Sequence, residues 1–142
     1  PGQGSGDVAD VVRRWIADPL ESGLLVSDGA RLVRLDSPTG EVLDAVPREA
    51  PAAWRGLDVV LAHHGLVQRL WGRDSDDGVV IAHGVEEALE GARRRSGVAL
   101  LLRAPSPADV AAVARANARM PRKSTLFVPK PRTGLVLRPH DD

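Results

Sequence analysis

Lysine occurs only twice in this sequence, and both lysines lie near its C-terminal end. The chain has 19 basic residues, and all of them except Lys123 and Lys130 are arginine. Ser124 and Thr125 directly follow the first lysine, and Arg132 lies two residues after the second. An ammonium group acts as a compact point charge beside a phosphate. Hydroxyl groups donate hydrogen bonds to the phosphate, and a guanidinium adds a bidentate contact. These five residues therefore predict a binding site for a phosphorylated or otherwise anionic small molecule.

The charge distribution at this end of the chain agrees with that prediction, but it also has a plainer interpretation. No acidic residue lies between positions 110 and 140, whereas the whole chain has a formal net charge of zero. Such asymmetry can focus a positive potential on one surface. The same residues also suit an exposed edge strand, which lysine and proline protect against aggregation. Under both interpretations we expect strands at residues 123–128 and 134–138.

Three stretches resemble an uncharacterised prokaryotic family called "domain of unknown function 1015". The most specific is MPRKSTLFVPKPRTGLV, which is similar to the family's C-terminal signature of Met-Pro-x-Lys-Ser-Thr, Pro-Lys and Thr-Gly-Leu-Val. Residues 57–59 with the two histidines that follow, and residues 101–110, are similar to two other segments of the family. The sequence departs from the family at Leu126 and His83, where aromatic residues are expected. The resemblance therefore implies no stacking role at these two positions.

The resemblance implies an organisation and a function. Relatives in the family are much longer, so residues 7–142 would form a single α/β domain at the C-terminal part of a longer protein, entered through a linker at residues 1–6. A further family motif, similar to one in ParB-like nucleotide-using proteins and free-serine kinases, would lie in the preceding part. The resemblance thus implies a small-molecule enzyme, with phosphoryl transfer to an amino acid or similar metabolite. A nucleotide would be its cofactor, and the N-terminal region of the same protein would be its partner.

Two histidines are secondary candidates for the site. His83 is expected at the end of a strand, just before a helix N-terminus, where α/β proteins often bind ligands. His64 is adjacent to His63, and adjacent helical residues point about 100° apart, which does not suit a shared metal ion. We therefore expect no metal site. The alternative for each histidine is an ordinary packed or hydrogen-bonded residue.

Composition argues against several classes of protein. Hydrophobic residues make up 43% and charged residues 27%, which is typical of a globular domain. The absence of cysteine rules out disulfides and thiolate metal sites, and we expect a cytoplasmic protein. No apolar run approaches the roughly 20 residues of a membrane span. The neutral charge balance argues against nucleic acid as a partner. A non-catalytic structural or interaction domain remains the alternative to an enzyme.

Hydrophobic periodicity predicts an α/β fold, with α+β as the alternative, in which helices are layered on a small mixed sheet. A hairpin turn is expected at Asp28-Gly29, because both residues tolerate positive φ angles. Ser106 is expected to cap a helix together with Asp109. A strand at 98–103 is expected to be covered on both faces. About four helices are expected, at 7–17, 57–71, 85–95 and 108–118, with further strands at 41–45 and 79–83.

Overall fold

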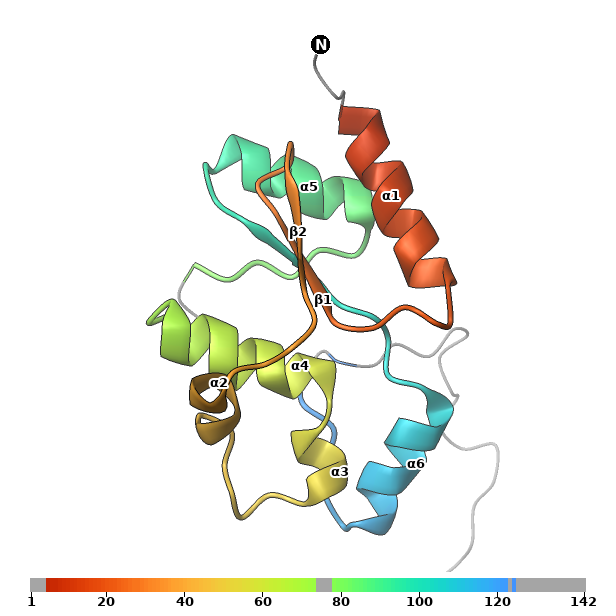
Figure 1. Ribbon diagram of the computed structural model, residues 1–142, viewed down its shortest axis with the longest axis vertical. Helices are drawn as coiled ribbons and strands as arrows, with labels where there is room; N and C mark the ends of the chain where they lie inside the picture. The colour runs from red at the N-terminus through yellow and green to blue at the C-terminus, as the bar shows by residue number, and fades with distance from the viewer. Residues whose placement is uncertain (1–4, 74–77, 123, 125–142) are drawn as a thin grey trace, which may run out of the picture.

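The computed structural model describes residues 5–73, 78–122 and 124, and over this part of the chain it confirms an α/β fold. Its elements follow one another as α1, β1, β2, α2, α3, α4, the π-helix η1, α5, β3 and α6. Figure 1 shows α1 and α5 beside the sheet in the upper half of the molecule, and α3 and α6 in the lower half. The two strands expected at 123–128 and 134–138 lie outside the described residues.

The sheet has three strands among the described residues, in the order β2-β1-β3. The strands are β1 Leu24–Ser27, β2 Leu32–Leu35 and β3 Ala99–Leu101. The expected hairpin joins β1 to β2, and Gly29 has the positive φ angle, 92°, that its turn requires. Asp28 accepts hydrogen bonds from the backbone N–H groups of Ala30 and Arg31, at 2.8 and 2.7 Å. Both strand pairs are antiparallel, so the expected parallel component of a mixed sheet is not found among these strands.

Helices cover both faces of the sheet, as predicted for β3. Side chains alternate between the two faces of a strand, and Leu25 packs in one apolar cluster while its neighbour Leu24 packs in another. The first cluster lies against α1 Ser5–Ala17 and α5 Val85–Arg94. The second lies against α2 Gly40–Asp44 and η1 Leu61–Leu70. Burial on both faces explains why the sequence of β3 reads as a continuous apolar run.

Two predicted strands are wrong. Residues 40–44 form α2 instead of a strand, and this short helix packs its buried Val42 against η1. Residues 79–82 form neither helix nor strand. Their apolar side chains Val79, Val80 and Ile81 are 40, 58 and 52% exposed, so the run that suggested a strand is not buried.

The helix predicted at 57–71 is present, but most of it is a π-helix. It begins with α4 Asp58–Val60 and continues as η1, and at its end the N–H of Trp71 donates to the carbonyl of Leu66, five residues back, at 2.9 Å. Gly72 follows with a φ of 60°, in the left-handed region, and ends the helix. π-helical turns are rare and occur often at functional sites.

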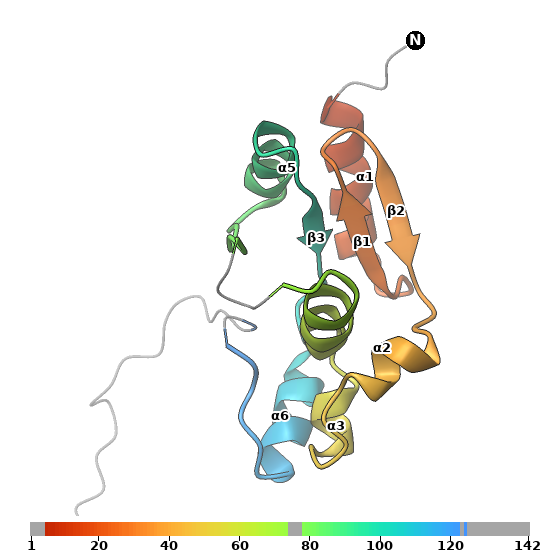
Figure 2. The same ribbon diagram turned by 90° about the vertical axis from the view of Figure 1, so that its left-hand side faces the viewer.

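A third apolar cluster joins the lower helices. It contains the buried side chains of Val46, Leu57, Val60 and Val113. Leu57 directly precedes α4, and Val113 belongs to α6 Pro107–Arg115. The helix α3, Ala52–Arg55, contributes Ala53 and Trp54, which are partly buried against this cluster. Figure 2 shows α3 and α6 side by side. The cluster therefore holds the N-terminus of α4 beside α3 and α6.

Candidate functional site

A pocket of about 270 Å³ lies between α3, the N-terminus of α4 and the connection from β3 to α6. Three charged residues line it: Asp58, Arg103 and Asp109. The rest of its lining is small and mostly apolar, from Ala52, Ala53, Gly56, Leu57, Val59, Ala104 and Pro105. The lining surface is more polar than apolar, and the volume lies just below the range of about 300–1,000 Å³ that is typical of small-molecule sites. We call it the Asp58 pocket.

Asp58 is the charged residue of this pocket that has no side-chain hydrogen bond among the described residues, although the charge of Arg103 acts on it. It is the first residue of α4 and is half-buried. Within the described part of the chain, its carboxylate makes no hydrogen bond or ion pair. Burial raises the pKa of the Asp58 carboxyl above its ordinary value, the positive charge of Arg103 opposes this rise, and the negative charge of Asp109 adds to it. The pocket thus contains a carboxylate that is available to a ligand.

The other two charged residues have partners. Arg103 donates a hydrogen bond to the backbone carbonyl of Glu21, and its guanidinium carbon lies 5.8 Å from the ring centroid of Trp15. Asp109 forms the predicted capping box with Ser106, accepting hydrogen bonds from its N–H at 2.9 Å and its hydroxyl at 2.7 Å. These hydrogen bonds lower the pKa of the Asp109 carboxyl, so it stays ionised. Both side chains are therefore held in position at the pocket wall.

The pocket brings together two segments that are far apart in the sequence. Residues 57–59 line one side and residues 103–105 with Asp109 line the other. Both belong to the stretches on which the expected family resemblance rests. Met120, at the start of the third such stretch, packs against the same apolar cluster as Leu57, which lines the pocket. The described beginning of the lysine-containing segment is therefore anchored on the cluster that supports the pocket.

Only one of the five predicted anion-binding residues lies in the described part of the chain. Ser124 is half-buried, and its hydroxyl donates a hydrogen bond to the carbonyl of Pro121 at 2.7 Å. Its backbone N–H donates to the same carbonyl at 3.3 Å, which closes a turn. The other four predicted residues, Lys123, Thr125, Lys130 and Arg132, lie outside the described residues.

The two candidate histidines lie elsewhere. His64 is half-buried on η1, with its ring centroid 5.7 Å from that of Trp54 and 4.9 Å from that of His63. His83 is exposed, and its backbone N–H donates to the carboxylate of Glu87 at the start of α5, at 2.9 Å. Neither histidine lines the Asp58 pocket. Within the described ranges, no three His, Cys, Asp or Glu side chains gather in a group that could hold a metal ion.

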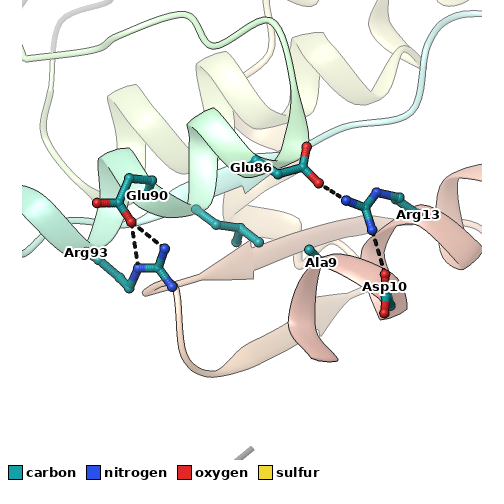
Figure 3. Close-up of a pocket in the computed structure, with 7 residues that line it drawn as sticks. Ala9, Asp10, Arg13, Glu86, Glu90 and Arg93 are labelled. Carbon is teal, nitrogen blue, oxygen red and sulfur yellow. Dashed lines mark hydrogen bonds and ion pairs between the residues drawn. The ribbon is translucent and has the colours of Figure 1, made fainter. Parts of the chain in front are cut away.

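A second pocket, of about 310 Å³, lies between α1 and α5 (Figure 3). Its charged residues form ion pairs with one another. Arg13 pairs with Asp10 on its own helix and with Glu86 on α5, while Glu90 pairs with Arg93. Of these exposed pairs only Arg13–Glu86 joins the two helices, and each pair contributes at most about 1 kcal/mol. In contrast to Asp58, the carboxylates in this pocket already have partners, so we do not assign a ligand to it.

Comparisons with known proteins identify no relative. No family model matches the chain, and neither a curated protein nor a solved structure is similar to it at a significant level. None of the helices in the described residues is long and apolar enough to cross a membrane.

Sequence reasoning did not name Asp58 or Arg103 as site residues. Both lie in stretches that the expected resemblance singled out, 57–59 and 101–110, but neither residue was assigned a role there. The residues alone do not show that these two stretches lie next to each other in the folded chain. Asp109 was expected only as a capping residue, and it is both a cap and a lining residue.

The raised pKa of Asp58 predicts a measurable pH effect on stability. The pKa of this carboxyl is higher in the folded than in the unfolded protein, so as pH rises the unfolded chain loses the proton first. The free energy of unfolding therefore falls as pH rises from the ordinary pKa of 3.8 through the raised pKa. Asp58→Asn removes this loss. We expect the variant to be more stable than the wild type at pH 7, by at most about 1 kcal/mol for a half-exposed group, and equally stable near pH 3.

Urea denaturation of both proteins between pH 3 and 7 measures this difference. Asp44→Asn is a suitable control, because Asp44 is an exposed aspartate that pairs with Arg48 on the surface. Its difference from the wild type should stay within about 0.5 kcal/mol over the same range. A constant difference between Asp58→Asn and the wild type at every pH would contradict the assignment of a raised pKa.

Proposed function

We propose that this chain is the ligand-binding part of a small-molecule enzyme whose ligand is phosphorylated or otherwise anionic. In this proposal the basic segment with Lys123, Ser124, Thr125, Lys130 and Arg132 binds the anionic group of the ligand. The observation that carries this proposal is the meeting of residues 57–59 and 103–105 in one pocket, with Met120 anchored on the supporting cluster. A pocket placed beside the start of a lysine-containing segment is suited to a small charged metabolite.

The resemblance to the family called "domain of unknown function 1015" supports the same proposal, since the pocket is lined by two of the three stretches that carry it. It adds phosphoryl transfer to an amino acid or a similar metabolite as the proposed reaction, with a nucleotide as the phosphoryl donor. The remaining catalytic groups would come from the N-terminal region of a longer protein. Cytoplasmic location is part of this proposal.

The direct test is the double variant Lys123→Ala/Lys130→Ala, measured by isothermal titration calorimetry with monoethyl phosphate. Each charge-assisted hydrogen bond to phosphate contributes about 1.5–3 kcal/mol, so we expect the affinity to fall at least tenfold. The thermal stability of the variant should stay close to that of the wild type.

A matched control is Arg94→Ala/Arg95→Ala, which also removes two positive charges but from the exposed end of α5. It should bind monoethyl phosphate as the wild type does. Equal affinity of the lysine variant and the wild type for monoethyl phosphate would contradict the proposal. An equal loss of affinity in both variants would indicate non-specific charge attraction.

A second candidate is a non-catalytic interaction domain. The observation that favours it is the exposed apolar run Val79, Val80 and Ile81, because contiguous exposed apolar side chains often mark a contact surface. This function predicts that the lysine substitutions change no ligand affinity, whereas polar substitutions in the run change association with a protein. The calorimetric experiment above therefore separates the two candidates.

A further inference from the structure

A row of apolar side chains crosses the face of the sheet that η1 covers at its lower end. Val26 on β1 is paired with Val33 on β2 and with Leu100 on β3, so these three side chains are neighbours on one face. Leu24 and Leu35, two residues from Val26 and Val33, lie on the same face and belong to the second apolar cluster. The row therefore continues an apolar surface that η1 and α2 cover only in part.

The uncovered part of this surface is exposed. Val26 and Leu100 are half-buried, whereas Val33 is 55% exposed. Val98, which directly precedes β3 and alternates with Leu100, is 53% exposed. In Figure 2, α1 lies behind the strands, and no helix lies in front of the upper part of the sheet. We call these four residues the upper sheet face.

The chain beyond Ser124 contains apolar residues suited to this face. Residues 125–142 include two apolar triplets, Leu-Phe-Val at 126–128 and Leu-Val-Leu at 135–137. Consecutive apolar residues are typical of an extended segment that is buried on both sides. Residues 134–137 have no charged side chain, and neither does the upper sheet face, so contact between them would bury no ionised group.

The described chain ends close to this face. Figures 1 and 2 both show the segment that follows α6, coloured blue, beside the helix η1, which covers the lower end of the same face. Leu135 is 11 residues beyond Ser124. At about 3.3 Å per residue an extended chain of this length spans about 35 Å, which is enough to reach across a domain. A second copy on this face would leave the apolar triplets of the same chain without a cover.

We propose that residues 134–137 pack across the upper sheet face and complete the cover that η1 begins. The basic segment would then be held at both ends, because Met120 already packs against the third apolar cluster. The inference concerns a contact within the chain and needs no ligand, so its test is independent of the test of the proposed function.

Cross-linking tests the contact directly, because the chain has no cysteine of its own. In the full chain, Val33→Cys/Val136→Cys treated with a short bismaleimide should form an intramolecular cross-link at least about tenfold faster than Leu20→Cys/Val136→Cys. Leu20 is a suitable control, because it is 91% exposed and follows α1, which packs on the opposite face of the sheet. Gel electrophoresis and intact mass separate intramolecular from intermolecular products.

Limited proteolysis adds a second measurement. Trypsin cleavage after Arg132, just before the proposed contact, should be about tenfold faster in Val33→Asp than in the wild type, because a charge on the face disfavours packing of the apolar segment. Leu20→Asp should be cleaved there at the wild-type rate. Circular dichroism confirms that both variants are folded.

Equal cross-linking rates in the two double variants, or no cross-link in either, would overturn the inference. Covalent dimers that form faster with Val33→Cys alone than with Leu20→Cys alone would also overturn it, since a second copy would then cover the face. Equal cleavage of Val33→Asp and the wild type after Arg132 would have the same meaning. None of these results changes the affinity for monoethyl phosphate, by which the proposed function is judged.

Discussion

Leu89→Ala is expected to lower the free energy of unfolding by about 3 kcal/mol, within the range of about 2–5 kcal/mol for leucine truncations in a core. Leu89 is only 2% exposed and lies on α5, in the cluster that joins α1 to the sheet. Truncation removes apolar contacts and leaves a cavity that the neighbouring helix and strands cannot fill without moving. Urea denaturation monitored by circular dichroism measures the loss.

The control for this substitution is Leu43→Ala on α2. Leu43 is 46% exposed, and its truncation should change stability by no more than about 0.5 kcal/mol. Because domains of this size are stable by only about 5–15 kcal/mol, the difference between the two variants is large compared with the total. Similar midpoints for both variants would mean that α5 does not pack on the sheet as described.

Gly65→Ala is expected to destabilise the protein by about 2 kcal/mol, although alanine is normally the better helix former. Gly65 is a buried residue of η1, and an added Cβ would lie 2.4 Å from Cγ1 of Val42 on α2. Val42 is itself buried and has a stiff side chain, so it cannot move away at low cost. The glycine is needed because the two helices approach each other at this point.

Two further variants test this explanation. Gly91→Ala on α5 should stabilise the protein by up to about 1 kcal/mol, because no atom lies within 4 Å of the added Cβ. Val42→Ala should partly rescue Gly65→Ala, with a coupling of about 1 kcal/mol in a double-mutant cycle. Strictly additive effects of the two substitutions would refute a steric contact between η1 and α2.

The correctly predicted elements are those in which the local sequence signals agree with the burial seen in the structure. The helices near 7–17 and 85–95 have a clear apolar stripe, and Ser106 caps α6 as its sequence suggests. The burial of single positions was less predictable. Val11 and Ile16 are apolar residues of α1 that are 36 and 41% exposed, whereas Ala9 on the same helix is buried. A helix that packs on one narrow sheet buries only part of its apolar stripe.

The failures arise where tertiary contacts decide the conformation. The strand at 79–83 was predicted from an apolar run, but periodicity cannot tell whether another strand is available to pair with it. The π-helix also has no signal in the sequence, because an apolar face can be arranged on either kind of helix. Just beyond the end of α5, Ser96 takes the left-handed conformation with a φ of 51°, which a serine rarely adopts, although Gly97 is the next residue.

The candidate site was predictable in its parts but not in its arrangement. The lysines and the resemblance drew attention to three stretches of chain, and periodicity placed two of them at a helix start and a strand end. That Asp58 lies half-buried beside Arg103, while Asp109 is held by Ser106, depends on the packing of α3, α4 and α6. Such packing is a property of the folded chain and not of any local sequence pattern.

The stacking of Arg103 on Trp15 gives the pocket an optical reporter. The indole excited state has a different dipole from its ground state, so a cation near the ring alters the wavelength and intensity of emission. Since Arg103 contacts Trp15 and also lines the pocket, any ligand that shifts the guanidinium changes that emission. With the other two tryptophans, Trp54 and Trp71, replaced by phenylalanine, the fluorescence of this single residue would record occupancy of the pocket without an added dye.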